Sequence, residues 1–296
     1  MLARRALAER TANQWLGGDF RRLALAGVVF FALAVSAWFI VRVGTLQNSS
    51  PVMTDDTKLD QHLQQAAITA LGDRRGAIIV MDPQTGRLRA VVNPELAFQE
   101  NFPPGSAIKP FTALAAFRAG LIDDDTRTLC HEKYFHGEFQ TTCSHPLDLP
   151  PLNPTEAIAY SCNYYFGKLG ERLPETNFKA TLSDFGFARK TGVNVANESA
   201  GKIVRARWQP QYAMGEGEYL QTTPLQLINA YAALVNGGRV FVPHLSATSN
   251  AVSEIQRNVT IDNDQRELIV KGMRGAVRYG TAESANLYSL PLYIFG

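Results

Sequence analysis

The sequence predicts an α+β domain, in which an antiparallel sheet is flanked by helices, preceded by one transmembrane helix. Three observations lead to this prediction. An apolar run of membrane-spanning length lies at 23–41, and a β-hairpin pattern follows at 76–92. Helix start signals are then mixed with strand patterns, without the regular strand–helix alternation of a parallel sheet. The 296 residues are enough for one large domain.

The apolar run predicts an uncleaved membrane anchor. From Leu23 to Val41 every residue except Ser36 is apolar or small, which gives roughly 28 Å of helix at about 1.5 Å per residue. Five arginines precede the run and Arg42 follows it, so the positive-inside rule places the N-terminus in the cytoplasm. A cleaved signal peptide is the alternative, because residues 35–37 are small, but the apolar run continues beyond them.

This anchor defines the expected organisation of the chain. We expect a cytoplasmic tail at 1–22, a transmembrane helix at 23–43, a linker and leading helix at 44–75, and a domain at 76–296 on the outer, periplasmic side of the cell (inner) membrane. A hydrophobic content of 46% indicates a globular protein with some membrane character. The net charge of +2 gives no electrostatic reason to expect nucleic acid as a partner.

Three cysteines lie in the part of the chain expected outside the cytoplasm, where disulfides are stable. Cys130 and Cys143 either close a short loop through a disulfide or stay free thiols. A metal site is a third interpretation, because His131, His136 and His145 are nearby in the sequence. The spacings fit no familiar zinc pattern, so no metal and no cofactor are expected.

Periodicity and capping signals predict the elements in chain order. Thr57–Leu71 reads as a helix that ends before Gly72, and residues 76–81 and 87–92 form a hairpin across a turn at 82–86. A helix is expected from Ser106 to Gly120. Two further helices, at 153–160 and 224–235, begin with an N-cap residue, a proline at the first position and an acid or amide at the third.

Ser106 and Lys109 form a candidate nucleophile and base. Positions three apart share one face of a helix, so the amine can reach the hydroxyl. The predicted helix start also offers backbone N–H groups, which favour the anionic intermediate of acyl transfer. The alternative is an exposed serine beside a solvated lysine. Pro110, inside the first turns of the predicted helix, sacrifices a hydrogen bond, and such violations are typical of functional sites.

Ser161 and Asn163 form a second candidate pair, directly after the helix at 153–160. A second hydroxyl can relay a proton between an amine and a leaving group, and an amide can hold a substrate carbonyl. By itself, the tripeptide at 161–163 is as typical of a turn as of a site.

Together these segments resemble the transpeptidase domain of penicillin-binding proteins, which shares its motifs with serine β-lactamases. The resemblance covers about residues 59–296, including the hairpin, the segment at 102–111 and the stretches at 182–201 and 214–233. It implies that Ser106 is the acylated nucleophile and Lys109 its base. It also implies that Ser161 relays a proton and that Asn163 positions the substrate.

The resemblance implies a D,D-transpeptidase or D,D-carboxypeptidase that acts on peptidoglycan stem peptides and binds β-lactam antibiotics. The cell membrane and other cell-wall synthesis proteins are further expected partners. Two alternatives stay open. One is a serine β-lactamase or β-lactam sensor, and the other is a catalytically silent scaffold.

The third motif of this family, Lys-Thr-Gly, is expected beyond Gly296. The chain's own Lys190-Thr191-Gly192 lies 27 residues after Asn163, and its surroundings predict a turn and not a strand. In the family, the motif follows a segment that resembles 275–283 and a strand, here 290–296. The sequence is therefore expected to be a fragment that folds poorly or acylates negligibly. Stoichiometric labelling of this piece by a penicillin would contradict that expectation.

Overall fold

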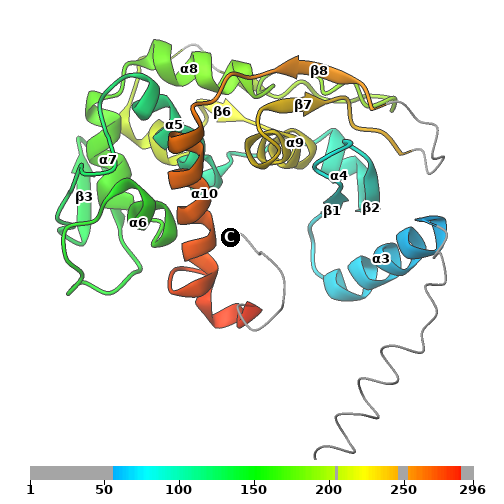
Figure 1. The fold of residues 1–296 in the computed structure, drawn as a ribbon, viewed down its shortest axis with the longest axis horizontal. Coiled ribbons are helices and arrows are strands. Elements are labelled where there is room, and N and C mark those ends of the chain that lie inside the picture. The colour runs from blue at the N-terminus through cyan, green and yellow to red at the C-terminus, as the bar shows by residue number, and fades with distance from the viewer. Residues whose placement is uncertain (1–55, 204–205, 246–252, 288–296) are drawn as a thin grey trace, which may run out of the picture. The chain divides into compact units, whose positions relative to one another are not determined.

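The computed structural model describes residues 56–287, apart from 204–205 and 246–252 (Figure 1). The expected anchor at 23–43 and the expected last strand at 290–296 lie outside these residues. Within the described part of the chain, no helix is both long and apolar enough to cross a membrane.

Helices and short strands are mixed along the described chain, as the α+β prediction requires. The α-helices are α3 (Asp56–Leu71), α4 (Pro94–Phe98), α5 (Lys109–Arg118), α6 (Pro154–Ala159), α7 (Asn163–Arg172), α8 (Glu175–Asp184), α9 (Pro224–Val235) and α10 (Asn263–Arg278). The strands are β1 (Ile78–Met81), β2 (Leu88–Val92), β3 (Lys133–His136), β4 (Phe139–Thr142), β5 (Lys202–Ile203), β6 (Leu220–Gln221), β7 (Arg239–Phe241) and β8 (Ile255–Asn258). Three 3₁₀ turns complete the set, at Gly105–Ile108, Pro210–Met214 and Glu283–Ala285.

The antiparallel pairing is confirmed, but the described strands do not form one sheet. They form four separate two-stranded sheets, β1–β2, β3–β4, β5–β6 and β7–β8. Helices pack on these pairs: α3 and α9 contact β1–β2, and α7 contacts β3–β4. Buried strand residues such as Tyr134 and Val240 belong to the main core, which is otherwise largely helical.

Local sequence signals place most of the predicted elements correctly. The hairpin pairs Ile78 with Val92, with an irregularity at the end of β1. The capping boxes at the starts of α6 and α9 are both complete. The side chains of Asn153 and Thr223 each accept a hydrogen bond from the backbone N–H of the third helical residue, and the side chain of that residue accepts one from the backbone N–H of the capping residue. These signals are local, so they hold whatever the tertiary context.

The helix predicted at 106–120 is shorter than expected. A 3₁₀ turn covers Gly105–Ile108, and α5 begins only at Lys109. Pro110 therefore lies in the first turn, where its missing N–H has no intrahelical partner to lose. The expected violation at Pro110 is wrong, and it gives no reason to assign function to this segment.

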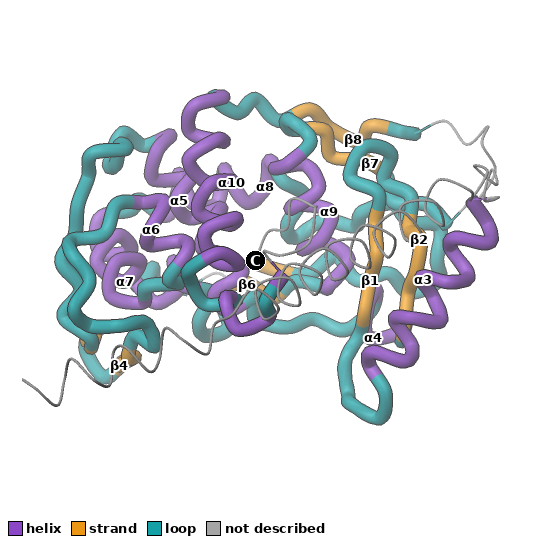
Figure 2. Tube along the Cα trace, turned by 60° about the horizontal axis from the view of Figure 1, so that its bottom comes forward, coloured by secondary structure: helices purple, strands orange, loops and turns teal. Residues whose placement is uncertain are grey.

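Helix α5 runs through the main core and fixes the position of Lys109. The side chains of Ile108, Phe111 and Leu114 are fully buried. The ring of Phe111 meets Phe185, Phe187 and Tyr231 edge-on, with centroids 5.1–5.3 Å apart. Figure 2 shows α5, α6, α7 and α10 gathered on one side of the described domain and the β1–β2 hairpin with α3 and α4 on the other.

Candidate functional site

The ammonium of Lys109 lies at the centre of the predicted site. The residue is 1% exposed, and its Nζ donates to the carbonyl oxygen of Ser161 at 2.7 Å, to Ser161 Oγ at 3.0 Å and to Asn163 Oδ1 at 2.6 Å. These three acceptors match the three protons of an ammonium group. The structure thus brings Lys109, Ser161 and Asn163 together, although more than fifty residues of sequence separate them.

Ser161 occupies a strained turn between α6 and α7. Its φ of 48° lies in the left-handed region, which residues other than glycine seldom adopt. In this conformation both its carbonyl oxygen and its hydroxyl face Lys109. Backbone strain of this kind is common where a side chain must point at a reacting group.

Both ends of the Asn163 amide are engaged. Its oxygen accepts from Lys109, and its Nδ2 donates to Thr141 Oγ1 and to the carbonyl oxygen of Thr142, each at 3.0 Å. Asn163 therefore ties the start of α7 to strand β4 and holds Lys109 in place.

Ser106 is exposed in the 3₁₀ turn that leads into α5. It lines a cavity of about 260 Å³ together with Lys109 and Ser161. The cavity walls also include Pro110 and five residues that the sequence analysis did not assign to the site: Ala107, Ile158, Tyr231, Ala276 and Thr281. The expected nucleophile, the expected base and the second hydroxyl thus line one cavity.

Long-range contacts hold the turn that carries Ser106. Tyr231 donates its hydroxyl hydrogen to the carbonyl oxygen of Ala107 at 2.7 Å. The hydroxyl of Thr112 donates to the carbonyl oxygen of Ala213 at 2.8 Å. The backbone N–H of Gly105 donates to the carbonyl oxygen of Gly215 at 3.2 Å. The segment around 213–215, far away in sequence, therefore helps to position the turn that carries Ser106.

Burial lowers the pKa of Lys109 to about 8, and nearby Cys162, Cys143 and Glu216 offset part of this effect. A charged amine loses more solvation on burial than a neutral one, so the neutral form gains relative weight. A lysine with this pKa is partly neutral near pH 7–8, as a general base must be.

We expect Gly215→Ala to disturb the nucleophile turn. Gly215 has a φ of +75°, and an added Cβ would lie 2.1 Å from the carbonyl oxygen of Gly105. The left-handed backbone and the clash together predict a loss of about 2–4 kcal/mol in the free energy of unfolding. If Ser106 is acylated, as the resemblance implies, labelling by a penicillin should also be slower. Urea denaturation and penicillin labelling measure the two effects.

Gly120→Ala is the matched control for this change. Gly120 also has a positive φ, of +66°, but an added Cβ there has no atom within 4 Å. It should lose only the backbone contribution, about 1 kcal/mol, and should label normally. Equal losses of stability in the two variants would show that the contact with Gly105 is unimportant.

Lys190-Thr191-Gly192 lies in a loop, as predicted, and has a structural role there. The backbone N–H and hydroxyl of Thr191 both donate to Glu198 Oε1, at 2.5 and 2.6 Å, and the Gly192 N–H donates to Glu198 Oε2 at 3.3 Å. The buried carboxylate of Glu198 thus organises this loop. None of Lys190, Thr191 and Gly192 lines the cavity of Ser106.

A group of thiols lies behind Ser161 and Asn163, and the sequence analysis saw only part of it. Cys130 and Cys143 are free thiols, with their sulfurs 3.4 Å apart, and Cys162, from inside the second motif, lies 3.7 Å from Cys143. A hydrogen bond with Cys162 lowers the pKa of Cys143 to about 5. The spacing of 13, 2 and 17 residues between Cys130, Cys143, His145 and Cys162 resembles no familiar ligand pattern, which is why the sequence did not predict the cluster.

Comparison with known proteins finds a matching family and several relatives. A family model described as penicillin binding protein transpeptidase domain matches residues 76–294. Peptidoglycan D,D-transpeptidase MrdA of Acinetobacter baumannii is 31% identical over 251 residues, which cover 68% of this chain and 36% of the relative. Stage V sporulation protein D of Bacillus subtilis is 26% identical over 222 residues, covering 66% of this chain and 32% of the relative. The chain thus spans about a third of the length of these relatives.

Solved structures show the same architecture. The crystal structure of Pseudomonas aeruginosa PBP2 in complex with WCK 5153 is 26% identical, with a TM-score of 0.68, and the match covers 77% of this chain and 63% of that one. The transpeptidase domain of Burkholderia pseudomallei penicillin-binding protein 3 shares the fold at 20% identity, with a TM-score of 0.65 and coverage of 80% and 72%.

Proposed function

Because the chain belongs to the penicillin-binding protein transpeptidase family, we propose that it is a serine D,D-transpeptidase or D,D-carboxypeptidase acting on peptidoglycan stem peptides. The observation that supports this most is the position of Lys109. It is buried, bonded to both residues of the second motif, and lines the same cavity as the exposed hydroxyl of Ser106.

The proposed reaction proceeds through an acyl-serine. Neutral Lys109 takes the proton of Ser106 while the Oγ of Ser106 attacks the penultimate carbonyl carbon of the stem peptide. The C–N bond to the terminal residue then breaks, and Ser161, which is bonded to Lys109, relays the proton to the leaving amine. An amine or water releases the acyl group in a second step. Asn163, whose Oδ1 accepts from Lys109, orients the base.

Product analysis with the full-length protein and a D-Ala-D-Ala stem peptide tests this function. Release of D-Ala with formation of a cross-linked product when an amine acceptor is present supports a transpeptidase, and release into water alone supports a carboxypeptidase. Rapid hydrolysis of penicillin without D-Ala release indicates a β-lactamase instead. A protein that neither acylates nor releases D-Ala is a silent scaffold, and the proposal then fails.

Acylation is expected to accelerate as pH rises through about 8, the pKa of Lys109. The base must be neutral, and the neutral fraction grows from about 9% at pH 7 to about 91% at pH 9, so the rate should rise about tenfold. The measurement is the rate of penicillin acylation of the full-length protein between pH 6 and 9.5. A flat profile across this range assigns the base to another group.

We also propose that residues 23–43 anchor the protein in the inner membrane, with 1–22 in the cytoplasm and the domain from 76 onward in the periplasm. The length of the apolar run and the arginines before it support this placement. It puts the site of Ser106 in the compartment where stem peptides and β-lactam antibiotics are met.

A further inference from the structure

A second pocket lies between α7 and the loop that joins α5 to β3. Its volume is about 390 Å³, and its walls are one face of α7 and loop residues between 122 and 131. No residue lines both this pocket and the cavity of Ser106. The pocket is therefore separate from the proposed catalytic site.

One side of α7 forms the first wall. Tyr165, Lys168 and Arg172 line the pocket, and they are three and four residues apart, so they share one side of the helix. Gly170 lies on the opposite side, where an added Cβ would be 2.5 Å from the carbonyl oxygen of Pro210. That side of α7 is closed by packing, whereas the side of Tyr165 faces the pocket.

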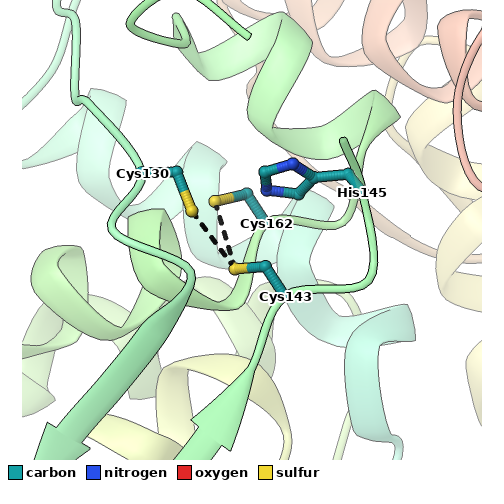
Figure 3. Close-up of side chains that lie close together, drawn as sticks. All are labelled: Cys130, Cys143, His145 and Cys162. Atoms are coloured by element: carbon teal, nitrogen blue, oxygen red, sulfur yellow. Dashed lines mark hydrogen bonds between the residues drawn. The ribbon is translucent and has the colours of Figure 1, made fainter. Parts of the chain in front are cut away.

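The loop that forms the second wall is held in place. The backbone groups of Thr128 and Leu152 bond to each other in both directions, at 3.0 and 2.9 Å. At the end of the loop, the sulfur of Cys130 lies 3.4 Å from that of Cys143 (Figure 3). The wall is thus formed before any ligand arrives, which lowers the cost of ordering the chain on binding.

Two guanidinium groups give the pocket positive charge. Arg127 donates to the carbonyl oxygen of Asp124, and Arg172 donates to that of Leu121 at 3.4 Å. Within the described part of the chain, neither guanidinium forms an ion pair with a carboxylate. Each has five N–H donors, so most of the donors of both side chains have no protein acceptor.

The acidic groups near the pocket do not cancel this charge. Glu171 is the one carboxylate among the lining residues, and Lys168 pairs with it at 2.5 Å. The acids at 123–125 belong to the same loop but do not line the pocket. The carboxylate of Asp123 also accepts from the hydroxyl of Thr126 at 2.6 Å. The positive charge in the walls is therefore available to a ligand.

A buried hydroxyl without a partner completes the pocket. Tyr165 is 3% exposed, and its hydroxyl has no hydrogen-bond partner among the described residues. Burial raises the pKa of this phenol above its ordinary value, and the nearby charges of Arg127 and Arg172 lower it in part. The hydroxyl therefore keeps its proton and is a donor. An unsatisfied buried donor costs free energy, which a bound acceptor recovers.

We propose that this pocket binds the oxyanion of a small molecule, either a phosphate or a carboxylate group. The planar guanidinium groups of Arg127 and Arg172 match the paired oxygens of such a group. The hydroxyl of Tyr165 supplies a third donor. Leu129 and Tyr164 lie in the same walls and offer apolar surface to the rest of the ligand.

Calorimetric titration of the purified full-length protein with inorganic phosphate tests this site, with the ionic strength held constant by sodium chloride. One equivalent should bind with a Kd below about 10 mM, because two charge-assisted hydrogen bonds are worth more than the free energy of so weak a complex. A parallel titration with succinate separates the two sources of an oxyanion. Tighter binding of phosphate identifies a phosphate group, and tighter binding of succinate identifies a carboxylate. If neither anion binds with saturation, the proposal is overturned.

Variants locate the bound anion. Arg127→Gln and Arg172→Gln should each weaken binding at least about tenfold, because each removes charge-assisted donors. Tyr165→Phe should weaken binding at least about threefold and leave the unliganded protein no less stable, because the lost hydroxyl has no partner there. Arg189→Gln, at an exposed arginine outside the pocket, should bind like the wild type. Equal affinity in all four variants would place the anion elsewhere and refute the site. None of these readouts depends on acylation, so the proposed function is tested separately.

Discussion

Ser106→Ala is expected to abolish covalent labelling of the full-length protein by a fluorescent penicillin, lowering the labelling rate at least about 10³-fold. The exposed hydroxyl of Ser106 lines the cavity that Lys109 and Ser161 also line. In the proposed mechanism this hydroxyl forms the bond to the penicillin, and alanine has no group that can replace it. Mass spectrometry of the labelled wild-type protein should place the acyl group on the peptide that contains residue 106.

The change should affect chemistry and leave the fold intact. Ser106 is exposed and is not part of the core, so the free energy of unfolding should change by less than about 0.5 kcal/mol. Ser284→Ala, at an exposed serine outside the cavity, serves as the control and should label like the wild type. If Ser106→Ala still labels at a normal rate, Ser106 is not the nucleophile and the proposed mechanism is wrong.

The sequence predicted those parts of the fold that local rules determine. The capping residues Asn153 and Thr223 and the turn at 82–86 act within a few residues of themselves, so α6, α9 and the first hairpin appear where expected. The start of α5 was misplaced because the turn at Gly105–Ile108 depends on a distant partner. The carbonyl oxygen of Gly215 accepts from Gly105, and no local pattern contains that contact.

The face of α9 shows the same limit. Its apolar spacing predicts a buried stripe of Leu225, Ile228, Tyr231, Ala232 and Val235. Leu225 and Ala232 are buried, but Ile228, Tyr231 and Val235 are only partly buried. They line an apolar cavity of about 470 Å³ between α9 and β1. Periodicity identifies which face of a helix is apolar, but what packs on that face is set by tertiary structure.

The candidate site was predicted as a set of residues but not as a geometry. Motif spacing proposed Ser106, Lys109, Ser161 and Asn163, and the structure places the last three in direct contact. Nothing in the sequence indicated that the amide of Asn163 is bound at both ends, or that Cys143 and His145 approach Cys162. These contacts depend on where the β3–β4 hairpin packs against α7, which is a tertiary feature.

Lys109→Met should retain the fold and lower the rate of acylation by about 10²–10⁴-fold, the usual contribution of a general base. Methionine fills a similar volume, and it removes a charge that is unfavourable in a buried position. Against this gain, the carbonyl and hydroxyl of Ser161 and the amide oxygen of Asn163 lose their donor, which costs about 1–3 kcal/mol for each acceptor that stays dry. The net change in the free energy of unfolding is the cost of the acceptors that stay dry less the gain from removing the buried charge, and urea denaturation measures it.

Two comparisons decide whether Lys109 acts as a base or only as a structural tie. Lys168→Met changes a half-exposed lysine paired with Glu171, and it should alter stability by less than about 1 kcal/mol and leave acylation unchanged. The pH profile gives the sharper test. Wild-type acylation should rise through about pH 8, and the variant should lose this rise, because a thioether does not titrate. If Lys109→Met is slow but keeps the wild-type pH profile, another group takes the proton of Ser106, and Lys109 serves to hold Ser161 and Asn163 in place.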